Sequence, residues 1–305
     1  MSAGRFFCSD ASRANGEQIY GTVAHIDSWL LIEYPGAWRP YAISDSALPD
    51  GVKQQLRGMA RHSPGQRQLF IRQGYQRRAT LRCFIAESRE ADSRLAYFDF
   101  ADYDEIGRFD AASAVLRATD ETILLVCTHG THDKCCAKFG RPVYASLHNC
   151  APERTWECTH VGGDRFAGNV VCLPHGIYYG HVEPDEATIL IDTLARREIW
   201  LEKYRGRCCY PRVAQVGEYF VRHEMGIKRI DALRLLGIER TPASGWRVRF
   251  EAAEPGQTCE AEFRTASRHL YQPLTCKSGA TGSIRQYELV RCRCRPNAGV
   301  GLETG

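Results

Sequence analysis

Residues 122–150 read TILLVCTHGTHDKCCAKFGRPVYASLHNC, and this stretch predicts a strand, a tight loop and a helix in direct succession. Its first five residues form a short apolar run typical of a buried strand, and Cys127 lies at the end of that run. Asp133 is the expected N-cap of the helix that follows, which we predict to extend to residue 148. Pro142 predicts a kink or a restart of that helix, because proline lacks a backbone donor.

The same order of elements is predicted upstream. LLIEYPG (Leu30–Gly36) matches LLVCTHG (Leu124–Gly130) in register, so that Glu33 falls opposite Cys127. Each segment is followed by a helix, three strands and a second helix. We therefore predict an α/β fold built by internal duplication, in which only the second copy keeps the candidate ligands.

The remaining elements follow from apolar runs bounded by turn residues. Strands are predicted at Trp29–Tyr34, Gln68–Arg72, Leu81–Ala86, Ala96–Phe100, Trp156–His160, Val170–Leu173, Ile177–His181, Trp246–Phe250, Cys259–Phe263 and Tyr287–Cys292. Helices are predicted at 51–61, 104–117 and 184–204, with two more over 211–237, and residues 1–18 are expected to be irregular. We expect three regions, at 1–118, 119–205 and 206–305, and the last to be a small α+β region.

Composition narrows the class of protein. The chain has 305 residues, of which 44% are hydrophobic and 25% charged, and its net charge is only +4. These values are ordinary for a globular protein and do not favour a nucleic-acid binder. We find no apolar run near the roughly 20 residues that cross a bilayer, and no secretory signal at the N-terminus. We therefore expect a cytoplasmic protein that binds neither nucleic acid nor membrane.

The chain has 14 cysteines, which we expect to remain thiols in a reducing compartment. Five of them, with four histidines, fall between Cys127 and Asp164. Clustered thiols and imidazoles indicate metal binding or redox chemistry. Six others are expected to be small buried residues: Cys83, Cys150, Cys208, Cys209, Cys259 and Cys276.

Cys127 and Cys136 are the strongest candidates. One leaves a strand, the other opens a helix, and Gly130 allows a tight turn between them, so the two thiols can converge on one centre. A helix N-terminus also lowers a thiol pKa, and only the thiolate binds metal. His160 and Asp164 form a second pair, and Gly162-Gly163 between them indicates a loop rather than a helix.

Several spaced motifs carry a family resemblance. C-x8-C with a paired CC spans Cys127–Cys136, W-x-C-[ST]-H-V-G-G-x-R-F-A-G-N spans 156–169, and L-P-x-G-x-Y-Y-G spans 173–180. With FCSD, GTVAHIDSWLLIEYPGAW and IRQGYQRR, this pattern resembles the sucrase/ferredoxin-like family over roughly residues 5–205. The resemblance implies a thioredoxin-like ferredoxin fold (βαβββα) in residues 119–205.

In that family, some members bind a 2Fe–2S cluster through the two cysteines of C-x8-C and the two histidines of H-x3-H. The resemblance therefore implies that Cys127, Cys136 and His160 are ligands, while Asp164 replaces the second histidine. Asp164 could ligate iron directly. Alternatively, it is a turn residue and the fourth ligand is Cys158, Cys172 or Cys135, or this member binds no cluster.

Residues around the candidate ligands have supporting roles in this interpretation. His129, His132, His148, His175 and His181 are expected at the surface or around the ligands. We expect Arg165 and Asn169 to hold the His160–Asp164 loop, and Arg165 could offset cluster charge. Cys292 and Cys294 form a C-x-C on a strand, a spacing that could chelate a metal, although nothing nearby completes a site.

The leading hypothesis is a 2Fe–2S protein that passes single electrons to or from a redox partner protein, a reductase or an electron acceptor. It is an electron-transfer protein rather than a catalyst in its own right. One alternative is a thioredoxin-like thiol oxidoreductase, although no C-x-x-C occurs at the strand-to-helix turn. Another is a zinc-binding protein with a Cys/His/Asp site.

Overall fold

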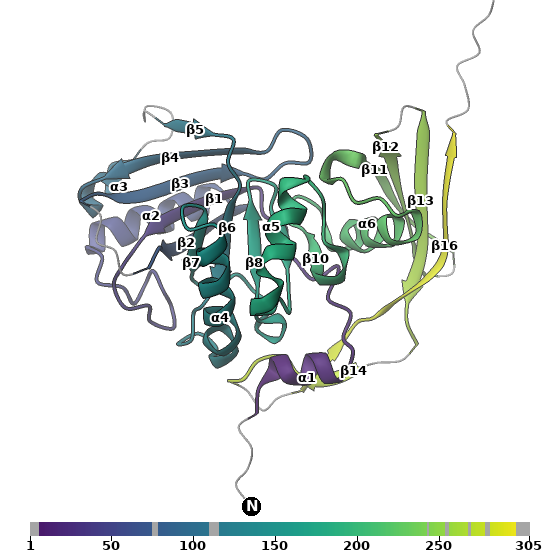
Figure 1. Ribbon diagram of the computed structural model, residues 1–305, viewed down its shortest axis with the longest axis horizontal. Helices are drawn as coiled ribbons and strands as arrows, with labels where there is room; N and C mark the ends of the chain where they lie inside the picture. Colours follow the sequence, from purple (N-terminus) through teal and green to yellow (C-terminus); the bar gives the residue numbers. More distant parts are fainter. Residues whose placement is uncertain are drawn as a thin grey trace, which may run out of the picture.

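A computed structural model describes most of the chain. It covers residues 6–74, 79–109, 116–242, 244–253, 256–267, 270–277 and 281–296. Among these residues, no helix combines the length and the apolar character that crossing a bilayer requires. The fold is mixed α/β, and most of its strands lie in one large sheet (Figure 1).

Two halves of the large sheet repeat one topology. The first half contains β1 (Ser28–Glu33), α2 (Asp50–His62), β2 (Gln66–Arg72), β3 (Leu81–Glu87), β4 (Arg94–Phe100) and α3 (Tyr103–Gly107). The second contains β6 (Ile123–Cys127), α4 (Lys134–Cys150), β7 (Thr155–Cys158), β8 (Val170–Leu173), β9 (Ile177–Tyr179) and α5 (Ala187–Ala195). The strand orders are β2-β1-β3-β4 and β7-β6-β8-β9. In both halves the first strand is parallel to the second and antiparallel to the third.

This repeat confirms the predicted thioredoxin-like βαβββα order and its degenerate first copy. Ile32 is the last β1 residue paired with β3, and Val126 is the last β6 residue paired with β8. The next residues, Glu33 and Cys127, therefore occupy equivalent places, as the match of LLIEYPG with LLVCTHG predicts. A carboxylate thus stands in the first half where the second half has a thiol.

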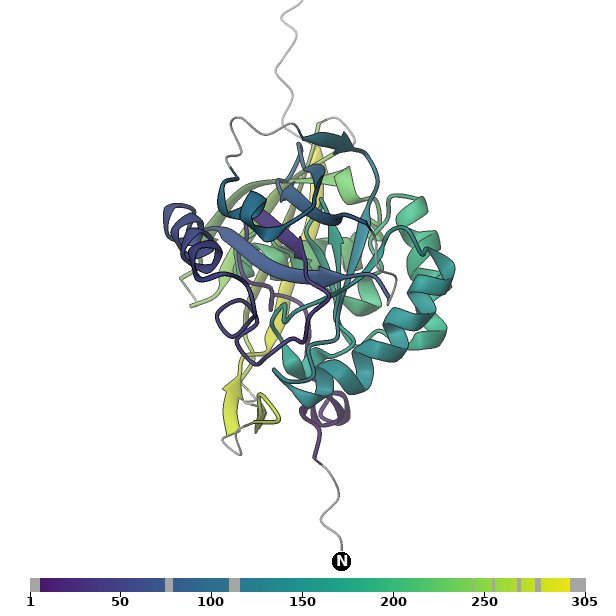
Figure 2. The same cartoon turned by 90° about the vertical axis from the view of Figure 1, so that its left-hand side faces the viewer.

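The two halves fold onto each other. They join where β2 meets β7 through only two residue pairs, Ile71 with Cys158 and Arg72 with Glu157. Phe84 of β3 packs edge-on against Trp156 of β7, with ring centroids 5.3 Å apart, although the two strands are not neighbours in the sheet. One apolar core therefore lies between the halves, and α2 and α4 cover opposite outer sides (Figure 2).

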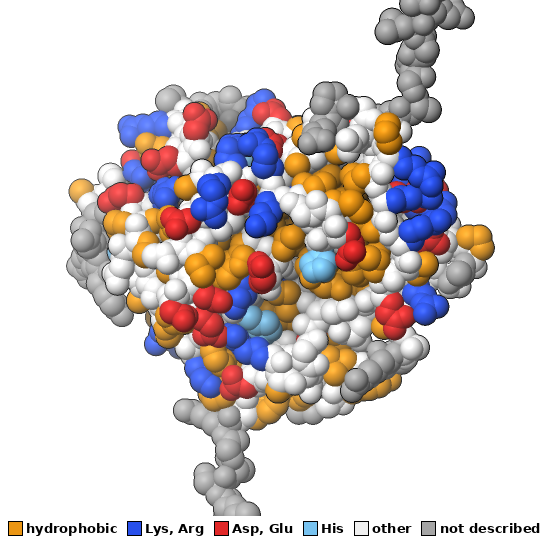
Figure 3. Space-filling model, turned by 45° about the vertical axis from the view of Figure 1, so that its right-hand side comes forward, with side chains coloured by type: hydrophobic (Ala, Val, Ile, Leu, Met, Phe, Trp, Pro, Cys, Tyr) orange, Lys and Arg blue, Asp and Glu red, His pale blue; other side chains and the backbone are white. Residues whose placement is uncertain are grey.

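The C-terminal part adds a second sheet. After β10 (Tyr204–Arg207), which extends the large sheet, α6 (Arg212–Met225) packs its apolar face on a four-stranded antiparallel sheet. Its strands, in spatial order, are β11 (Leu233–Arg240), β12 (Trp246–Ala252), β13 (Gln257–Thr265) and β16 (Tyr287–Pro296). Cross-strand arginine–glutamate pairs lie on this sheet, and charges of both signs are interspersed over the molecular face in Figure 3.

A small corner joins the N-terminal helix to a hairpin that precedes the last strand, β16. The helix α1 (Cys8–Ala14) lies against a hairpin of β14 (Leu270–Pro273) and β15 (Thr281–Ile284) (Figure 1). Asn15 donates from Nδ2 to Gln272 Oε1 at 2.7 Å across this contact. The expectation of irregular structure over residues 1–18 is therefore wrong for 8–14, which become helical where they pack on α4 and the hairpin; residues 1–5 lie outside the described part of the chain.

Several helix predictions also need correction. α4 continues past Pro142 and does not restart there, because its buried face, with Val143 and Leu147, is packed on the sheet and this packing outweighs one missing hydrogen bond. α5 is not the long helix predicted over 184–204: it ends at Ala195, and Arg197 takes a positive φ of 54°.

The two other mismatches involve shorter elements. Residues 211–237 contain one α-helix, a short 3₁₀ turn and the start of β11, since the alternating side chains of 233–240 pair with β12. α3 overlaps the helix predicted at 104–117 only over residues 104–107, and β5 (Arg117–Thr119) follows; residues 110–115 lie outside the described part of the chain.

The cysteine predictions hold only in part. Cys83 and Cys208 are buried thiols and Cys209 is half-buried, but Cys150 is exposed at the end of α4. Cys259 is not a free thiol, because it forms a disulfide with Cys294, the residue directly opposite it on β16. The Cys292/Cys294 pair therefore does not offer two thiols to a metal. Cys276 belongs to a cluster described below.

Candidate metal centre

Cys127 and Cys136 meet where β6 ends and α4 begins. Their sulfurs and a ring nitrogen of His160 all lie within 4.8 Å of one another. Both cysteine residues are fully buried. Asp133 caps α4 as predicted, accepting from the Cys135 amide at 2.8 Å, and this fixes the turn that presents Cys136.

The helix and the strand approach each other closely at Gly140. A Cβ atom at this position would stand 2.1 Å from the carbonyl oxygen of Cys127. No side chain larger than hydrogen fits there without moving α4. Gly140 therefore sets the distance between the strand that carries Cys127 and the helix that carries Cys136.

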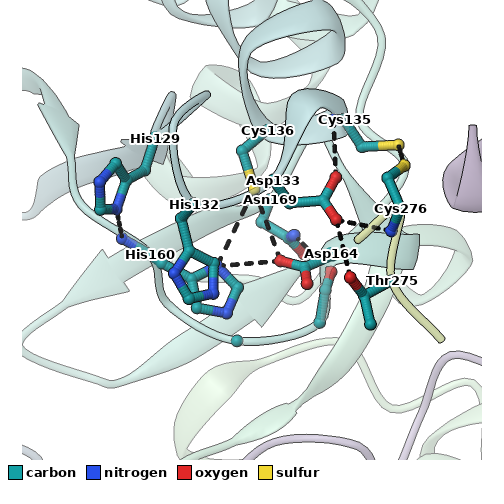
Figure 4. Close-up of polar contacts among 12 residues, drawn as sticks. His129, His132, Asp133, Cys135, Cys136, His160, Asp164, Asn169, Thr275 and Cys276 are labelled. Carbon is teal, nitrogen blue, oxygen red and sulfur yellow. Dashed lines mark hydrogen bonds and ion pairs between the residues drawn. The ribbon is translucent and has the colours of Figure 1, made fainter. Parts of the chain in front are cut away.

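His160 and Asp164 lie on the loop after β7, not on one face of a helix. Gly162 and Gly163 have φ values of 94° and 80°, and Asp164 then opens the 3₁₀ turn η1 (Asp164–Phe166). His160 Nδ1 lies 3.1 Å from Asp164 Oδ1. Cys136 Sγ is 3.9 Å from that nitrogen and 3.7 Å from that oxygen (Figure 4). The loop thus places His160 with both sulfurs, and it brings Asp164 into contact with Cys136 and His160.

A buried arginine holds this loop. Arg205 donates from Nη1 to the carbonyl of Gly162 at 3.0 Å and to Asn169 Oδ1 at 2.8 Å, while Asn169 Nδ2 donates to Gly163 O at 2.8 Å. Burial lowers the pKa of Arg205 to about 10. The role predicted for Asn169 is therefore visible, but Arg165 instead pairs with Glu17 at 2.6 Å.

Sequence reasoning missed Arg205. The sequence signal for Arg205 was the segment Tyr204–Arg207, in which arginines alternate with uncharged residues and no acidic residue is present to pair with them. An arginine inside a buried strand has to be matched by acceptors, and here the loop carbonyl and the Asn169 amide supply them.

Two further histidines pack against His160. His129 Nδ1 accepts from the His160 amide at 3.2 Å, and its Nε2 donates to the carbonyl of Arg39 at 2.8 Å. The ring of His132 stacks on that of His160 with centroids 3.9 Å apart. Burial is the main cause that lowers the pKa of both flanking histidines, which favours their neutral forms. The loop carrying Arg39 belongs to the first half, so that half helps to enclose the centre.

The two thiols titrate as a pair. A hydrogen bond from Cys136 lowers the pKa of Cys127 well below its usual value, with further contributions from His160 and the His129 amide. The same hydrogen bond and burial raise the pKa of Cys136. Cys127 is therefore the first of the two thiols to become a thiolate. The pKa of the Asp164 carboxyl is raised as well, mainly by burial.

Burial is uneven across the group. The two cysteines are sealed inside, whereas the side chains of His160 and Asp164 are 17% and 13% exposed. A cleft of about 760 Å³ adjoins the Gly162–Gly163 loop, and Arg205 and Arg212 are among the residues that line it. A centre held here would approach solvent through its histidine–aspartate side.

The alternative fourth ligands do not lie with this group. Cys172 of β8 packs with Leu124 of β6 in the core under α4. That core lies on the other side of the sheet from the one that contains Cys127. Cys158 is the register partner of Cys127, but like Asp164 it is not one of the three residues whose donor atoms lie within 4.8 Å of one another. Asp164 is distinguished by its contacts with Cys136 Sγ and His160 Nδ1. The sulfur of Cys135 turns away from Cys136 toward Cys8 and Cys276.

Comparison with known proteins places the chain. The profile of the sucrase/ferredoxin-like family matches residues 19–206. The chain belongs to this family. That confirms the resemblance stated from the motifs, and the matched region contains both halves of the large sheet and every candidate ligand.

Individual similarities cover less of this family member. "Altered inheritance of mitochondria protein 32" of Meyerozyma guilliermondii is 32% identical over 99 residues, which are 29% of this chain and 35% of that protein. The chain thus matches about a third of that relative's length. A thioredoxin-like [2Fe-2S] ferredoxin from Aquifex aeolicus is 18% identical, covering 30% of this chain and 97% of the ferredoxin, with a TM-score of 0.27. Its Cys59Ser variant is 17% identical over 28% of this chain and 97% of the variant, with a TM-score of 0.25.

Proposed function

We propose that this member of the sucrase/ferredoxin-like family binds a 2Fe–2S cluster and transfers single electrons. The observation that supports the proposal is the convergence of two buried sulfurs, an imidazole and a carboxylate, from β6, α4 and one loop, at the edge of a thioredoxin-like sheet. The cysteine pair and the His160–Asp164 pair lie in separate segments, with β7 between them. When bound, such a cluster accepts and releases one electron at a time.

The donor set suits two irons. Cys127 and Cys136 form a sulfur pair, and His160 and Asp164 form a second pair whose donor atoms are 3.1 Å apart. Two ligands on one metal, each bonded at about 2.0–2.1 Å in a tetrahedral arrangement, would be separated by about 3.3 Å. The second pair therefore has the spacing of two ligands on a single iron. Histidine ligation of one iron, with cysteine on the other, is an established pattern for such clusters.

The surrounding residues have separable tasks. His129 fixes the backbone of His160, and His132 covers the face of its ring. Arg205 and Asn169 hold the loop through its carbonyls. Asp164 contributes a negative charge that a second histidine would not, and this lowers the affinity of the centre for an electron.

Electrons would enter and leave the centre through its partially exposed histidine–aspartate side. His132, His160 and Asp164 are half-buried, while both cysteines are fully enclosed. We propose that a redox partner protein, a reductase or an electron acceptor, docks over this side. Transfer through His160 would be shorter than through the buried thiols.

A thiol oxidoreductase is a poorer fit. Such an enzyme presents a reactive thiolate to a disulfide in its substrate. Here Cys127 and Cys136 have no exposed surface, so a protein disulfide cannot reach them without unfolding of the loops. The vicinal Cys135 and Cys136 point into different clusters and do not form a dithiol pair.

A single zinc ion is the second candidate. Cys136 Sγ lies only 3.9 Å from His160 Nδ1, which is close to the separation of about 3.5 Å expected for sulfur and nitrogen on one tetrahedral ion. Ligands on two irons are farther apart, because the iron–iron vector lies between them. The compactness of the group favours one ion, and the family and the paired donors favour the cluster.

Anaerobic purification of the full chain decides between the candidates. A 2Fe–2S protein is coloured and yields two iron and two acid-labile sulfide per chain, and Cys127→Ser and Cys136→Ser should each abolish the colour. Cys172→Ser is the control, since this buried thiol lies on the other side of the sheet. If the protein is colourless and contains zinc that is lost in Cys127→Ser, the result would contradict the cluster and support a single zinc ion.

A further inference from the structure

Three cysteines from distant segments bring their sulfurs together next to the candidate centre. Cys8 begins α1, Cys135 lies in the first turn of α4, and Cys276 follows β14. Cys135 Sγ is 3.6 Å from Cys8 Sγ and 3.2 Å from Cys276 Sγ, and the third side of the triangle is 3.5 Å. All three distances far exceed the roughly 2.05 Å of a disulfide bond.

The triangle has nearly the size that one metal ion requires. Zinc binds thiolate sulfur at about 2.3 Å, so two sulfurs on a tetrahedral ion are about 3.8 Å apart. The three sulfur–sulfur distances are shorter than that separation by about 0.2–0.6 Å. A small adjustment of side chains would therefore admit an ion at the centre of the group.

Asp133 supplies the fourth position. Its Oδ1 accepts from the Cys135 amide at 2.8 Å, and its Oδ2 accepts from the Cys276 amide at 2.7 Å and from Thr275 Oγ1 at 3.1 Å (Figure 4). A carboxylate oxygen of Asp133 and the three sulfurs all lie within 4.8 Å of one another. Fixed donors thus hold the carboxylate in place, as outer partners do for metal ligands.

We propose that this three-cysteine site, made of Cys8, Cys135, Cys276 and Asp133, binds one zinc ion. A sulfur-rich tetrahedral set suits zinc, and a site with four protein ligands is a structural one. Cys8, Cys135 and Asp133 are buried, and only Cys276 is half-buried, so the ion would be closed off from substrates. The Cys8 amide donates to Cys276 Sγ at 3.3 Å, a bond that stabilises a metal-bound thiolate.

A zinc ion at this site would stabilise a part of the fold that has few apolar contacts. The corner formed by α1, the start of α4 and the β14–β15 hairpin has a very small apolar core, whose buried members are Cys8, Cys135 and Ala167. So small a core contributes little to stability, and small cores are commonly supplemented by metals or disulfides. A zinc ion would fasten the N-terminal helix and the C-terminal hairpin to the helix that presents Cys136.

This proposal does not rest on the proposed electron transfer, and the two can be tested apart. Zinc is measured in the purified full-length chain, in Cys8→Ser, in Cys276→Ser and in Cys127→Ser, with Cys83→Ser as a buried control outside both clusters. We expect Cys8→Ser and Cys276→Ser to lose one zinc per chain while any iron and colour remain. Cys127→Ser and Cys83→Ser should keep that zinc.

A second measurement covers variants that fail to fold. Metal-stripped Cys127→Ser protein, in which the neighbouring centre lacks a sulfur, is titrated with Co²⁺. Intense thiolate-to-cobalt absorption at one equivalent supports the proposal, and its absence overturns it. Zinc content unchanged by Cys276→Ser, or a disulfide between two of the three cysteines found by alkylation and mass spectrometry of the intact chain, would overturn it as well.

Discussion

Cys135 and Cys136 are adjacent in the chain, yet their sulfurs belong to different clusters. Cys135 Sγ lies 3.2 Å from Cys276, whereas Cys136 Sγ lies 3.7 Å from Asp164. Successive residues in the first turn of a helix point about 100° apart, which allows one turn of α4 to serve both groups. The position of Cys136 is therefore linked to the packing of α1 and of the β14–β15 hairpin on α4.

The first prediction concerns the charge of Asp164 and its effect on the midpoint potential. Asp164→His replaces an anionic ligand by a neutral one, which favours the reduced cluster. We expect the midpoint potential to rise, by on the order of 100 mV, in an anaerobic redox titration with the cluster retained. Asp185→His, at an exposed position on the 3₁₀ turn η2 (Pro184–Glu186), controls for surface charge. A potential that falls or does not move would remove Asp164 from the ligands.

Gly140 tests the close contact of α4 with β6. Gly140→Ala places a methyl group against the carbonyl of Cys127, so the helix has to move. We expect the free energy of unfolding to fall by about 1–3 kcal/mol, as in other overpacked sites, and bound metal to be lost faster to a chelator.

The first half of the fold provides a matched control for that substitution. Gly58 lies inside α2, the helix equivalent to α4, and a Cβ there meets nothing within 4 Å. Gly58→Ala should therefore stabilise the chain by about 0.5–1 kcal/mol. Equal effects of the two substitutions in urea denaturation would show that the contact at Gly140 has no special role.

Arg205 tests how the His160–Asp164 loop is held. In Arg205→Lys, the single ammonium group of the lysine cannot replace both hydrogen bonds that the guanidinium donates to Gly162 O and Asn169 Oδ1. A buried acceptor left without a donor costs about 1–3 kcal/mol. We expect lower stability together with faster metal loss. Arg212→Lys, on the same cleft but exposed, should leave both quantities nearly unchanged. Stability lost without any change in metal retention would mean that the loop does not position the ligands.

Two half-buried histidines, His175 and His181, predict a pH dependence of stability. Burial lowers the pKa of His175 from 6.5 to about 4 and that of His181 to about 3. Between these values and 6.5 the unfolded chain binds more protons than the folded one, so the free energy of unfolding falls as the pH falls. Urea denaturation at pH 7 and pH 5 should show this loss, and His181→Gln should reduce it. His62→Gln, exposed on α2, should not; an unaltered slope in His181→Gln would contradict the assignment.

Local patterns predicted where the candidate ligands lie in the fold, and the reasons are physical. The Cys127 and Asp133 positions follow from a strand exit and an N-cap, and two glycines mark the loop that carries His160 and Asp164. These signals act within a few residues. The repeat of LLIEYPG and LLVCTHG likewise predicted two copies, because a strand keeps its register in a duplicated fold.

The three-cysteine site could not be predicted in the same way. Cys8, Cys135 and Cys276 are separated by more than a hundred residues, and only the packing of α1 and the β14–β15 hairpin on α4 unites them. The Cys259–Cys294 disulfide depends on strand register, and the burial of Arg205 on the partners it finds in three dimensions. Long-range pairing of this kind leaves no short-range pattern in a single sequence.

The central claim is that His160, with the two buried sulfurs, holds a redox-active cluster. Pulsed electron paramagnetic resonance of the reduced protein measures this directly, since a coordinated imidazole couples its nitrogen to the unpaired electron. We predict a strong nitrogen coupling in the wild-type chain that disappears in His160→Cys while the cluster signal remains, and that persists in His132→Ala. A cluster signal without nitrogen coupling, or a coupling that survives in His160→Cys, would contradict the account.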